Sequence, residues 1–193
     1  MKLEPNGSLE TAKQKMSNRQ MAVIALMTAL MCILGPMSIP IGAIPISFTN
    51  LVIYITAYLL GTKFGAISYC IYLLIGMVGI PVFSGFSGGP AKLAGPTGGY
   101  LIGFLFIAII SGIFIQKGHG KNAISILGMI LGTLVAYIFG TIWFVIQAEC
   151  TVMYALTVCV FPFLIADGIK IIVASKVGPL IQNTLHKAHL LDT

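Results

Sequence analysis

Charged residues are scarce in this sequence, and their scarcity excludes an ordinary soluble domain. Lys and Arg number 11 and Asp and Glu number 5 among 193 residues, so 8% of the chain is charged. Soluble domains carry roughly 25% charged residues. Hydrophobic residues make up 58% of the chain, and its mean hydropathy is +1.00. This composition predicts a protein that is embedded in a lipid bilayer.

The sequence also lacks the residue groupings that catalysis, metal binding and ATP hydrolysis need. No embedded Ser–His, Cys–His or paired carboxylate set is present, and no GxxxxGK[ST] motif occurs. We therefore expect no enzyme activity, no metal site and no cofactor. The three histidines fall in segments expected on the cytoplasmic side: His119, His186 and His189. The four cysteines have no C-x-x-C spacing and are expected to be buried, inert thiols: Cys32, Cys70, Cys150 and Cys159.

The apolar runs predict an all-α membrane protein with six transmembrane helices. A helix needs about 20 apolar residues to cross a bilayer. The expected helices are 19–35, 48–61, 64–79, 97–116, 122–147 and 162–183. The apolar stretch 151–160 is too short to span and is interpreted as a half-helix or a capping segment. The expected organisation is a polar cytoplasmic tail, a membrane domain and a second cytoplasmic tail, over 1–18, 19–185 and 186–193.

The basic residues predict the orientation in the plasma membrane. The net charge is +6, but the Lys and Arg residues lie at the chain ends and in short turns, which favours membrane orientation over nucleic-acid binding. Positive-inside counting places both termini and the turns 62–63 and 116–122 in the cytoplasm. The long, nearly uncharged loops 35–47 and 80–96 then share the outer face. We expect them to form a lid over a cavity, the alternative being simple solvent loops.

Asp167 and Lys170 are the exception to this distribution, because they lie inside an apolar helix. A charge at the centre of a span costs at least about 2.5–3.5 kcal/mol, and a spacing of three places both residues on one helix face. We expect Asp167 in the first turn of helix 162–183, where the helix dipole favours an anion. The pair either satisfies itself structurally or recognises a ligand. Ligand recognition is the favoured interpretation, since a buried ion pair adds little stability.

Helix 19–35 carries small residues on roughly one face: Ala22, Ala25 and Ala29. Small residues at this spacing allow membrane helices to approach closely. The spacing alone fits a contact with a partner protein and a contact within this bundle equally well.

Four stretches, in order, resemble the BioY family over residues 20 to 180. They are "IPIGAIPISFTNL" (39–51), "YLLIGMVGIPVFSG" (72–85), "GPTGGYLIGF" (95–104) and "FPFLIADGIKI" (161–171). Members of this family are the biotin-binding S components of energy-coupling-factor (ECF) vitamin transporters. The resemblance implies a six-helix uptake component that binds biotin near the outer face and performs no chemistry. The alternatives are an S component for another small carboxylate-bearing vitamin and a structural membrane partner without a ligand.

The resemblance also implies roles for individual residues. Asp167 is expected to accept a hydrogen bond from the ureido ring of biotin, and Lys170 to help hold the valerate carboxylate. Biotin is longer than the gap between these two side chains, so Lys92 in the second loop is the other candidate for the carboxylate. Tyr100 and Phe83 are the candidates for the wall around the ring system. Thr49 stands where many family members carry Gln, and the neighbouring Asn50 is expected to make the polar contact in its place.

The implied partners are a membrane coupling protein and two cytoplasmic ATPases, which supply the driving force for transport. In the family, small alanines on the first helix dock onto the coupling protein, so Ala22, Ala25 and Ala29 are the expected docking residues. The implied mechanism is toppling of the whole bundle within the membrane, so that an outward-facing pocket becomes inward-facing.

Overall fold

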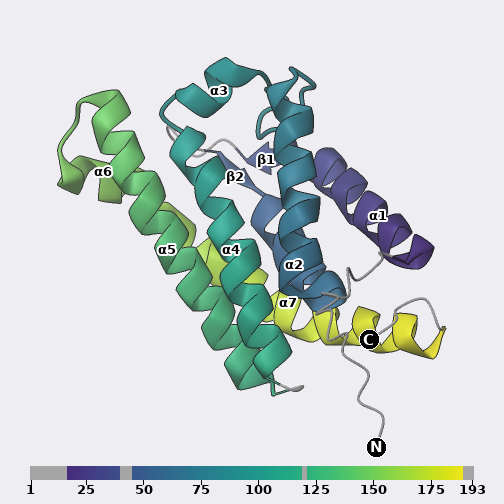
Figure 1. The fold of residues 1–193 in the computed structure, drawn as a ribbon. Helices are drawn as coiled ribbons and strands as arrows, with labels where there is room; N and C mark the ends of the chain where they lie inside the picture. The colour runs from purple at the N-terminus through teal and green to yellow at the C-terminus, as the bar shows by residue number, and fades with distance from the viewer. Residues whose placement is uncertain (1–16, 40–44, 119–120, 189–193) are drawn as a thin grey trace, which may run out of the picture.

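A computed structural model describes residues 17–39, 45–118 and 121–188, and these residues are mostly helical (Figure 1). The first helix, α1 (Asn18–Leu34), begins at a capping box in which Ser17 caps the backbone and the Gln20 side chain bonds the Ser17 amide. Its buried residues are Ile24, Met27, Thr28 and Met31, and they pack on the next helix.

The second helix, α2 (Thr49–Met77), is broken at Gly61, whose φ of 67° and ψ of −167° are not helical. A methyl group placed on Gly65 would lie 3.8 Å from the Ala57 Cα. Residues eight apart in a continuous helix are about 12 Å apart along the axis. The chain therefore reverses at Gly61, and the halves 49–60 and 62–77 form an antiparallel hairpin. These halves correspond to the separately predicted helices 48–61 and 64–79.

Helices α4 (Gly98–Lys117) and α5 (Asn122–Ala148) form the most extensive helix pair of the bundle. Small residues bring their backbones together: a methyl group on Gly103 would lie 3.2 Å from the Ala136 Cα. Close approach of this kind is typical of membrane helix pairs. The pair fixes the position of α5, which supplies one wall of the site described below.

The last two helices are α6 (Val152–Cys159) and α7 (Phe161–Lys187), which meet at a bend of 41°. The segment 151–160, expected to be a half-helix or a capping segment, thus contains a helix of 8 residues. Within the described residues, α2, α4 and α5 are each long and apolar enough to cross a membrane, and α6 with α7 makes a fourth if the bent pair is one span. Helix α1 is shorter, at 17 residues.

Short ordered elements occupy the two long loops at one end of the bundle (Figure 1). Strands β1 (Ser38–Ile39) and β2 (Ile46–Ser47) pair antiparallel in the first loop, and helix α3 (Pro90–Ala94) lies in the second. The loops contact each other, because the Gly85 amide donates to the Pro36 carbonyl at 3.1 Å. Residues 40–44, part of the predicted lid, lie outside the described residues.

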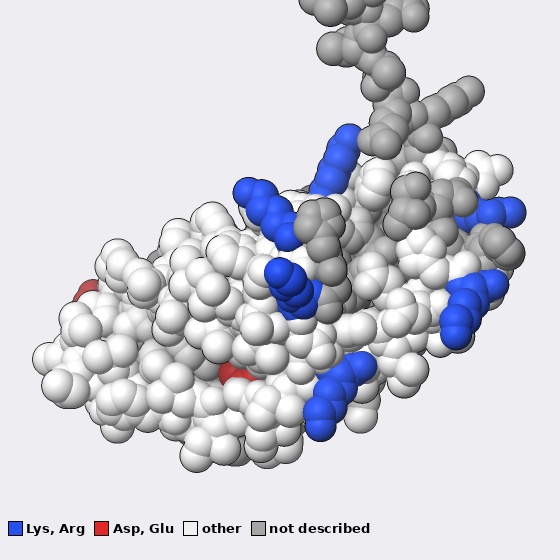
Figure 2. Space-filling view, turned by 90° about the horizontal axis from the view of Figure 1, so that it is seen from below, with Lys and Arg blue, Asp and Glu red and all other residues white. Residues whose placement is uncertain are grey.

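Basic side chains gather at the opposite end of the bundle. Figure 2, the view from below Figure 1, shows Lys and Arg side chains distributed over this face. The exposed basic residues of the described chain are Arg19, Lys63, Lys117, Lys121, Lys176 and Lys187. Glu149, by contrast, caps α5 at the end where α6 begins. This asymmetry is the one that positive-inside counting predicts.

Candidate functional site

Helix α7 carries Asp167 and Lys170 into the bundle, where 6% and 8% of their surfaces remain exposed. The Lys170 Nζ lies 2.9 Å from the Asp167 Oδ1, so the two form the i,i+3 ion pair that their spacing predicts. One expectation was wrong. Helix α7 begins at Phe161, with Pro162 in its first turn, so Asp167 lies in the second turn. The dipole effect falls off within the first turn and contributes little here.

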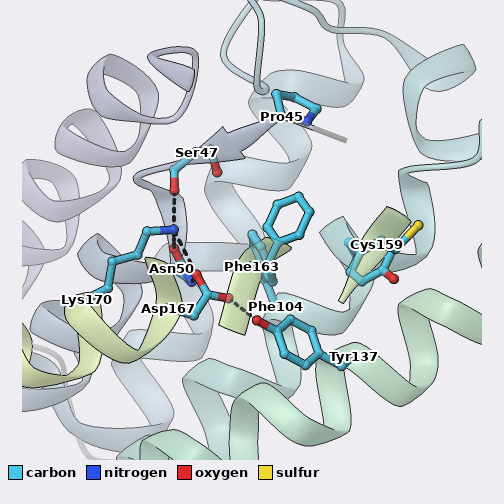
Figure 3. Close-up of a pocket in the computed structure, with 10 residues that line it drawn as sticks. Pro45, Ser47, Asn50, Phe104, Tyr137, Cys159, Phe163, Asp167 and Lys170 are labelled. Atoms are coloured by element: carbon cyan, nitrogen blue, oxygen red, sulfur yellow. Dashed lines mark hydrogen bonds and ion pairs between the residues drawn. The ribbon is translucent and has the colours of Figure 1, made fainter. Parts of the chain in front are cut away.

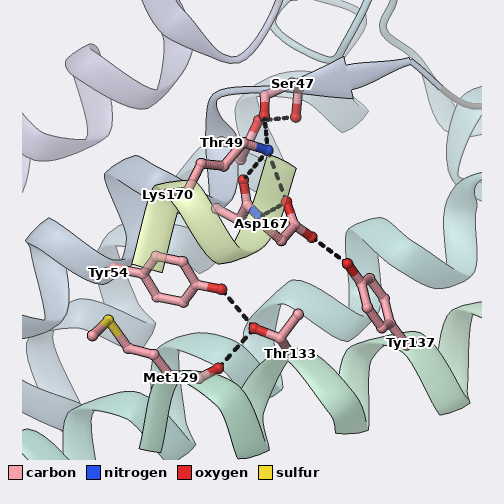
Figure 4. A network of polar contacts seen from close by, with 9 residues as sticks. Ser47, Thr49, Tyr54, Met129, Thr133, Tyr137, Asp167 and Lys170 are labelled. Atoms are coloured by element: carbon pink, nitrogen blue, oxygen red, sulfur yellow. Dashed lines mark hydrogen bonds and ion pairs between the residues drawn. The ribbon is translucent and has the colours of Figure 1, made fainter. Parts of the chain in front are cut away.

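Groups from three further elements complete the environment of the Asp167–Lys170 pair (Figure 4). Asn50, near the start of α2, donates through Nδ2 to the Asp167 Oδ1 at 2.8 Å. Tyr137, on α5, donates its hydroxyl to the Asp167 Oδ2 at 2.6 Å. Lys170 also donates to the Asn50 Oδ1 at 3.0 Å and to the Ser47 carbonyl of β2 at 2.8 Å. The outer loop, α2, α5 and α7 therefore converge on a single ion pair.

A second polar chain lies deeper on the same side of α5. The Tyr54 hydroxyl is 2.6 Å from the Thr133 Oγ1, which in turn donates to the Met129 carbonyl at 2.7 Å (Figure 4). Thr133 is one helical turn from Tyr137 on the same helix. This chain satisfies the buried Tyr54 hydroxyl and orients α5 against α2 beneath the carboxylate network.

The carboxylate network forms the polar side of a cavity of about 40 Å³ (Figure 3). Aromatic rings supply much of the rest of its wall. The lining residues are Pro45, Ser47, Asn50, Tyr100, Phe104, Tyr137, Cys159, Phe163, Asp167 and Lys170. A volume of this size holds a few water molecules. A larger ligand therefore requires the lining side chains, or the outer loop that contributes Pro45 and Ser47, to move outward.

The structure brings together four of the seven predicted ligand residues: Asp167, Lys170, Asn50 and Tyr100. The Tyr100 hydroxyl lies 3.0 Å from the Thr141 Oγ1, so its ring is held in place at the wall.

The other three predicted ligand residues lie outside the described lining of this cavity. Thr49 is buried and accepts a hydrogen bond from the Ser47 Oγ at 3.1 Å. Phe83 is completely buried, and its ring meets the Tyr72 ring edge-on at 5.6 Å. Lys92 is half-buried on α3, in the second outer loop.

Sequence reasoning missed Tyr137, Phe104 and Phe163. A tyrosine in the middle of an apolar span was the available signal, because its hydroxyl needs a partner when buried. The two phenylalanines carry no such signal, since an apolar side chain in a membrane helix can face lipid as well as a cavity. Of the four cysteines expected to be buried, only Cys159 is, and it lines the cavity as well; Cys32 and Cys150 are partly buried, and Cys70 is exposed.

A family model described as the BioY family matches residues 10–187. The chain belongs to the BioY family. Among its relatives, "Biotin transporter BioY" of Thermotoga maritima is 34% identical over 161 residues, which are 83% of this chain and 94% of that protein. "Probable biotin transporter BioY" of Pyrococcus horikoshii is 32% identical over 167 residues, 86% of this chain and 98% of that protein.

A solved structure confirms the all-α part of the expected fold. The crystal structure of the S-component for biotin from an ECF-type ABC transporter matches with a TM-score of 0.81 and 30% sequence identity. The match covers 87% of this chain and 95% of that one. The chain is therefore an all-α membrane protein of the S-component type.

Proposed function

We propose that this chain is the biotin-binding S component of an ATP-driven ECF vitamin transporter in the plasma membrane. The observation that carries the proposal is the match, over 87% of the chain, to the solved S-component for biotin. The cavity fits this role: it offers a hydrogen-bonding carboxylate and amide at one side and aromatic rings around it. Such a lining suits a small ligand with a polar head and an apolar body.

The proposed topology has six crossings. They are α1, the two halves of α2, α4, α5 and the bent pair of α6 and α7. An even number of crossings places both ends of the chain on the cytoplasmic side, together with the exposed basic turns around Lys63 and Lys121. The loops that contain β1, β2 and α3 then face outward, and we propose that they form the lid of the cavity.

In the proposed complex, Asp167 and Asn50 bind the ureido ring of biotin. Asp167 accepts from a ring N–H, and Asn50 donates to the ring carbonyl through its amide. Tyr100 forms part of the wall around the ring system. Thr49 and Phe83 support this arrangement from behind, Thr49 through Ser47 and Phe83 through its packing on Tyr72.

Lys92 is the proposed partner of the biotin carboxylate. Lys170 is less suited to this task, because its three N–H donors already meet Asp167, Asn50 and the Ser47 carbonyl. Lys92 lies on α3 in the same outer region as β2. The ligand would then point its carboxylate toward the lid and its ring toward Asp167.

Ala22, Ala25 and Ala29 form the proposed docking surface for the membrane coupling protein. All three are exposed on α1, whereas the residues that pack α1 into the bundle lie on its other face. An exposed strip of small residues allows a partner helix to approach closely. The coupling protein would connect the chain to two cytoplasmic ATPases, and toppling of the whole bundle would carry the pocket inward.

Direct binding tests the proposed function. The purified chain, in detergent or nanodiscs and without any partner, should retain labelled biotin at nanomolar concentration. Unlabelled biotin should displace the label, whereas pantothenate, another small vitamin with a carboxylate, should not. Displacement by pantothenate at equal concentration would favour an S component for a different vitamin. If the chain retained neither labelled biotin nor labelled pantothenate, a structural membrane partner would be favoured.

A further inference from the structure

Three protein groups donate to the carboxylate of Asp167, and they divide unequally between its two oxygens. The Oδ1 accepts from Asn50 at 2.8 Å and from Lys170 at 2.9 Å. The Oδ2 accepts from the Tyr137 hydroxyl at 2.6 Å. An ionised carboxylate has about four acceptor positions. Three are occupied, so one position remains, on the oxygen that Tyr137 holds.

The same count shows which ligand chemistry the network can still accept. Lys170 has three N–H donors and meets three protein acceptors, so it is saturated. Asn50 uses one of its two amide N–H groups on Asp167, and its side chain also interacts with the Tyr54 hydroxyl. The network therefore offers one acceptor, on Asp167, and carries no net charge. A neutral group with an N–H, such as a urea or an amide, complements this offer.

Tyr137 occupies a rigid position from which it can fix the direction of the free acceptor. Its neighbour Ala136 packs against Gly103 of α4, where the two helix backbones are in close contact. The Tyr137 ring lines the cavity together with Asp167. The torsion that rotates an Asp carboxylate has a broad, two-fold preference, so a carboxylate without a partner on Oδ2 turns easily. Side chains locked by packing and hydrogen bonds hold binding groups to the productive geometry.

We propose that Tyr137 is a positioning residue for ligand recognition, acting through Asp167: its hydroxyl orients the carboxylate so that the remaining acceptor position of Oδ2 faces the cavity. This inference rests on the proposed function, because it assumes that Asp167 accepts an N–H of biotin. Tyr137, on α5 and 30 positions from Asp167 in the sequence, would then contribute to the preference of the site for a neutral N–H donor.

A double-mutant cycle on the purified chain tests the proposal. The biotin affinity is measured for the wild type, Tyr137→Phe, Asp167→Asn and the double variant. A hydrogen bond to a charged group contributes about 1.5–3 kcal/mol, so Tyr137→Phe should weaken biotin binding roughly tenfold to a hundredfold. The double variant should bind no more weakly than Asp167→Asn alone, because Tyr137 has no effect without the carboxylate. Additive losses would show that Tyr137 acts independently of Asp167 and would overturn the proposal.

Tyr69→Phe is the matched control, because Tyr69 is also buried and donates its hydroxyl to the Leu101 carbonyl at 2.6 Å, and neither residue lines the cavity. It should change biotin affinity less than twofold. A second ligand keeps the test decisive if Asp167→Asn binds too weakly to measure. A biotin derivative methylated on the ring nitrogens should bind the wild type and Tyr137→Phe equally, since it offers Asp167 no N–H.

Two outcomes are distinguishable from each other. Unchanged biotin affinity in a folded Tyr137→Phe variant would overturn the positioning role and leave the proposed function intact. Absence of biotin binding by the wild-type chain would instead overturn the proposed function itself.

Discussion

The Asn50 amide and the Asp167 carboxylate, 117 positions apart in the sequence, meet at 2.8 Å inside the bundle. Asn50 begins the α2 hairpin and Asp167 lies on α7, so their contact links the outer loop that precedes α2 to the last helix. Lys170 closes the same link by bonding Ser47 in that loop. A substitution or a ligand that changes these hydrogen bonds should therefore affect both the pocket and the loop that contains Ser47.

Removing the ion pair in two steps separates its effect on folding from its effect on binding. Lys170→Met leaves the Asp167 charge buried without its cation, which should lower the free energy of unfolding by about 3–5 kcal/mol. The double variant Asp167→Leu with Lys170→Met should recover most of that stability, because apolar replacements of a buried pair are often neutral. It should still fail to bind biotin. Thermal unfolding and equilibrium binding of both variants provide the measurement.

A double variant that folds and binds biotin like the wild type would show that the pair is structural. The ligand site would then have to be built from other residues of the cavity.

The uncharged analogue of biotin tests the role of Lys92. Lys92→Ala should weaken biotin binding about threefold to tenfold, as expected for a partly exposed ion pair, and leave the affinity for biotin amide unchanged. Lys63→Ala removes an exposed lysine from the opposite end of the bundle and should affect neither ligand. Equal effects of Lys92→Ala on both ligands would mean that Lys92 acts on the loop rather than on the carboxylate.

Ala25→Leu tests the docking surface on α1. The added bulk should abolish co-purification with the coupling protein and leave biotin binding intact, because Ala25 is exposed and α1 contributes no residue to the cavity lining. Ala148→Leu makes the same change at an exposed position at the end of α5 and should preserve assembly. If the Ala25→Leu chain still assembles, helix α1 is not the contact.

The helix reversal at Gly61 makes a prediction about stability. Its φ of 67° and ψ of −167° lie in a region that essentially only glycine adopts, and any other residue there costs roughly 1–3 kcal/mol. An added methyl group would also overlap the amide of Gln116, which bonds Thr62 next to the turn. Gly61→Ala should therefore lower the thermal unfolding midpoint. Gly168→Ala, in a helix with open space around the added methyl, should leave it unchanged or raise it. Equal thermal unfolding midpoints for the two variants would contradict the claim that the turn at Gly61 requires a glycine.

The sequence was sufficient for much of the fold and for two polar residues of the candidate site. Apolar length and turn residues located the helices, since those signals are local in the chain. The cost of burying charge singled out Asp167 and Lys170, and both lie in the cavity wall. The family resemblance was confirmed by the family model and by the solved structure.

The rest of the site depends on contacts between helices that are distant in the chain. Such contacts cannot be predicted from the residues that neighbour each position in the sequence. Tyr137 meets Asp167 because of how α5 rotates on α4, and that rotation follows from close packing at Gly103. Phe83 carried the right chemistry for a pocket wall, but the fold packs it against Tyr72 instead. Helices that are apolar on all faces give no periodic signal of which face turns inward.

The most direct test of the whole account is the biotin affinity of the isolated chain before and after neutralisation of one buried acid. Asp167→Asn should weaken binding by well over tenfold, whereas Glu149→Gln, at the exposed end of α5, should leave it unchanged. Nanomolar binding by the wild type together with this difference is the predicted result. Equal affinities for the wild type and Asp167→Asn would contradict the claim that the buried carboxylate network recognises the vitamin.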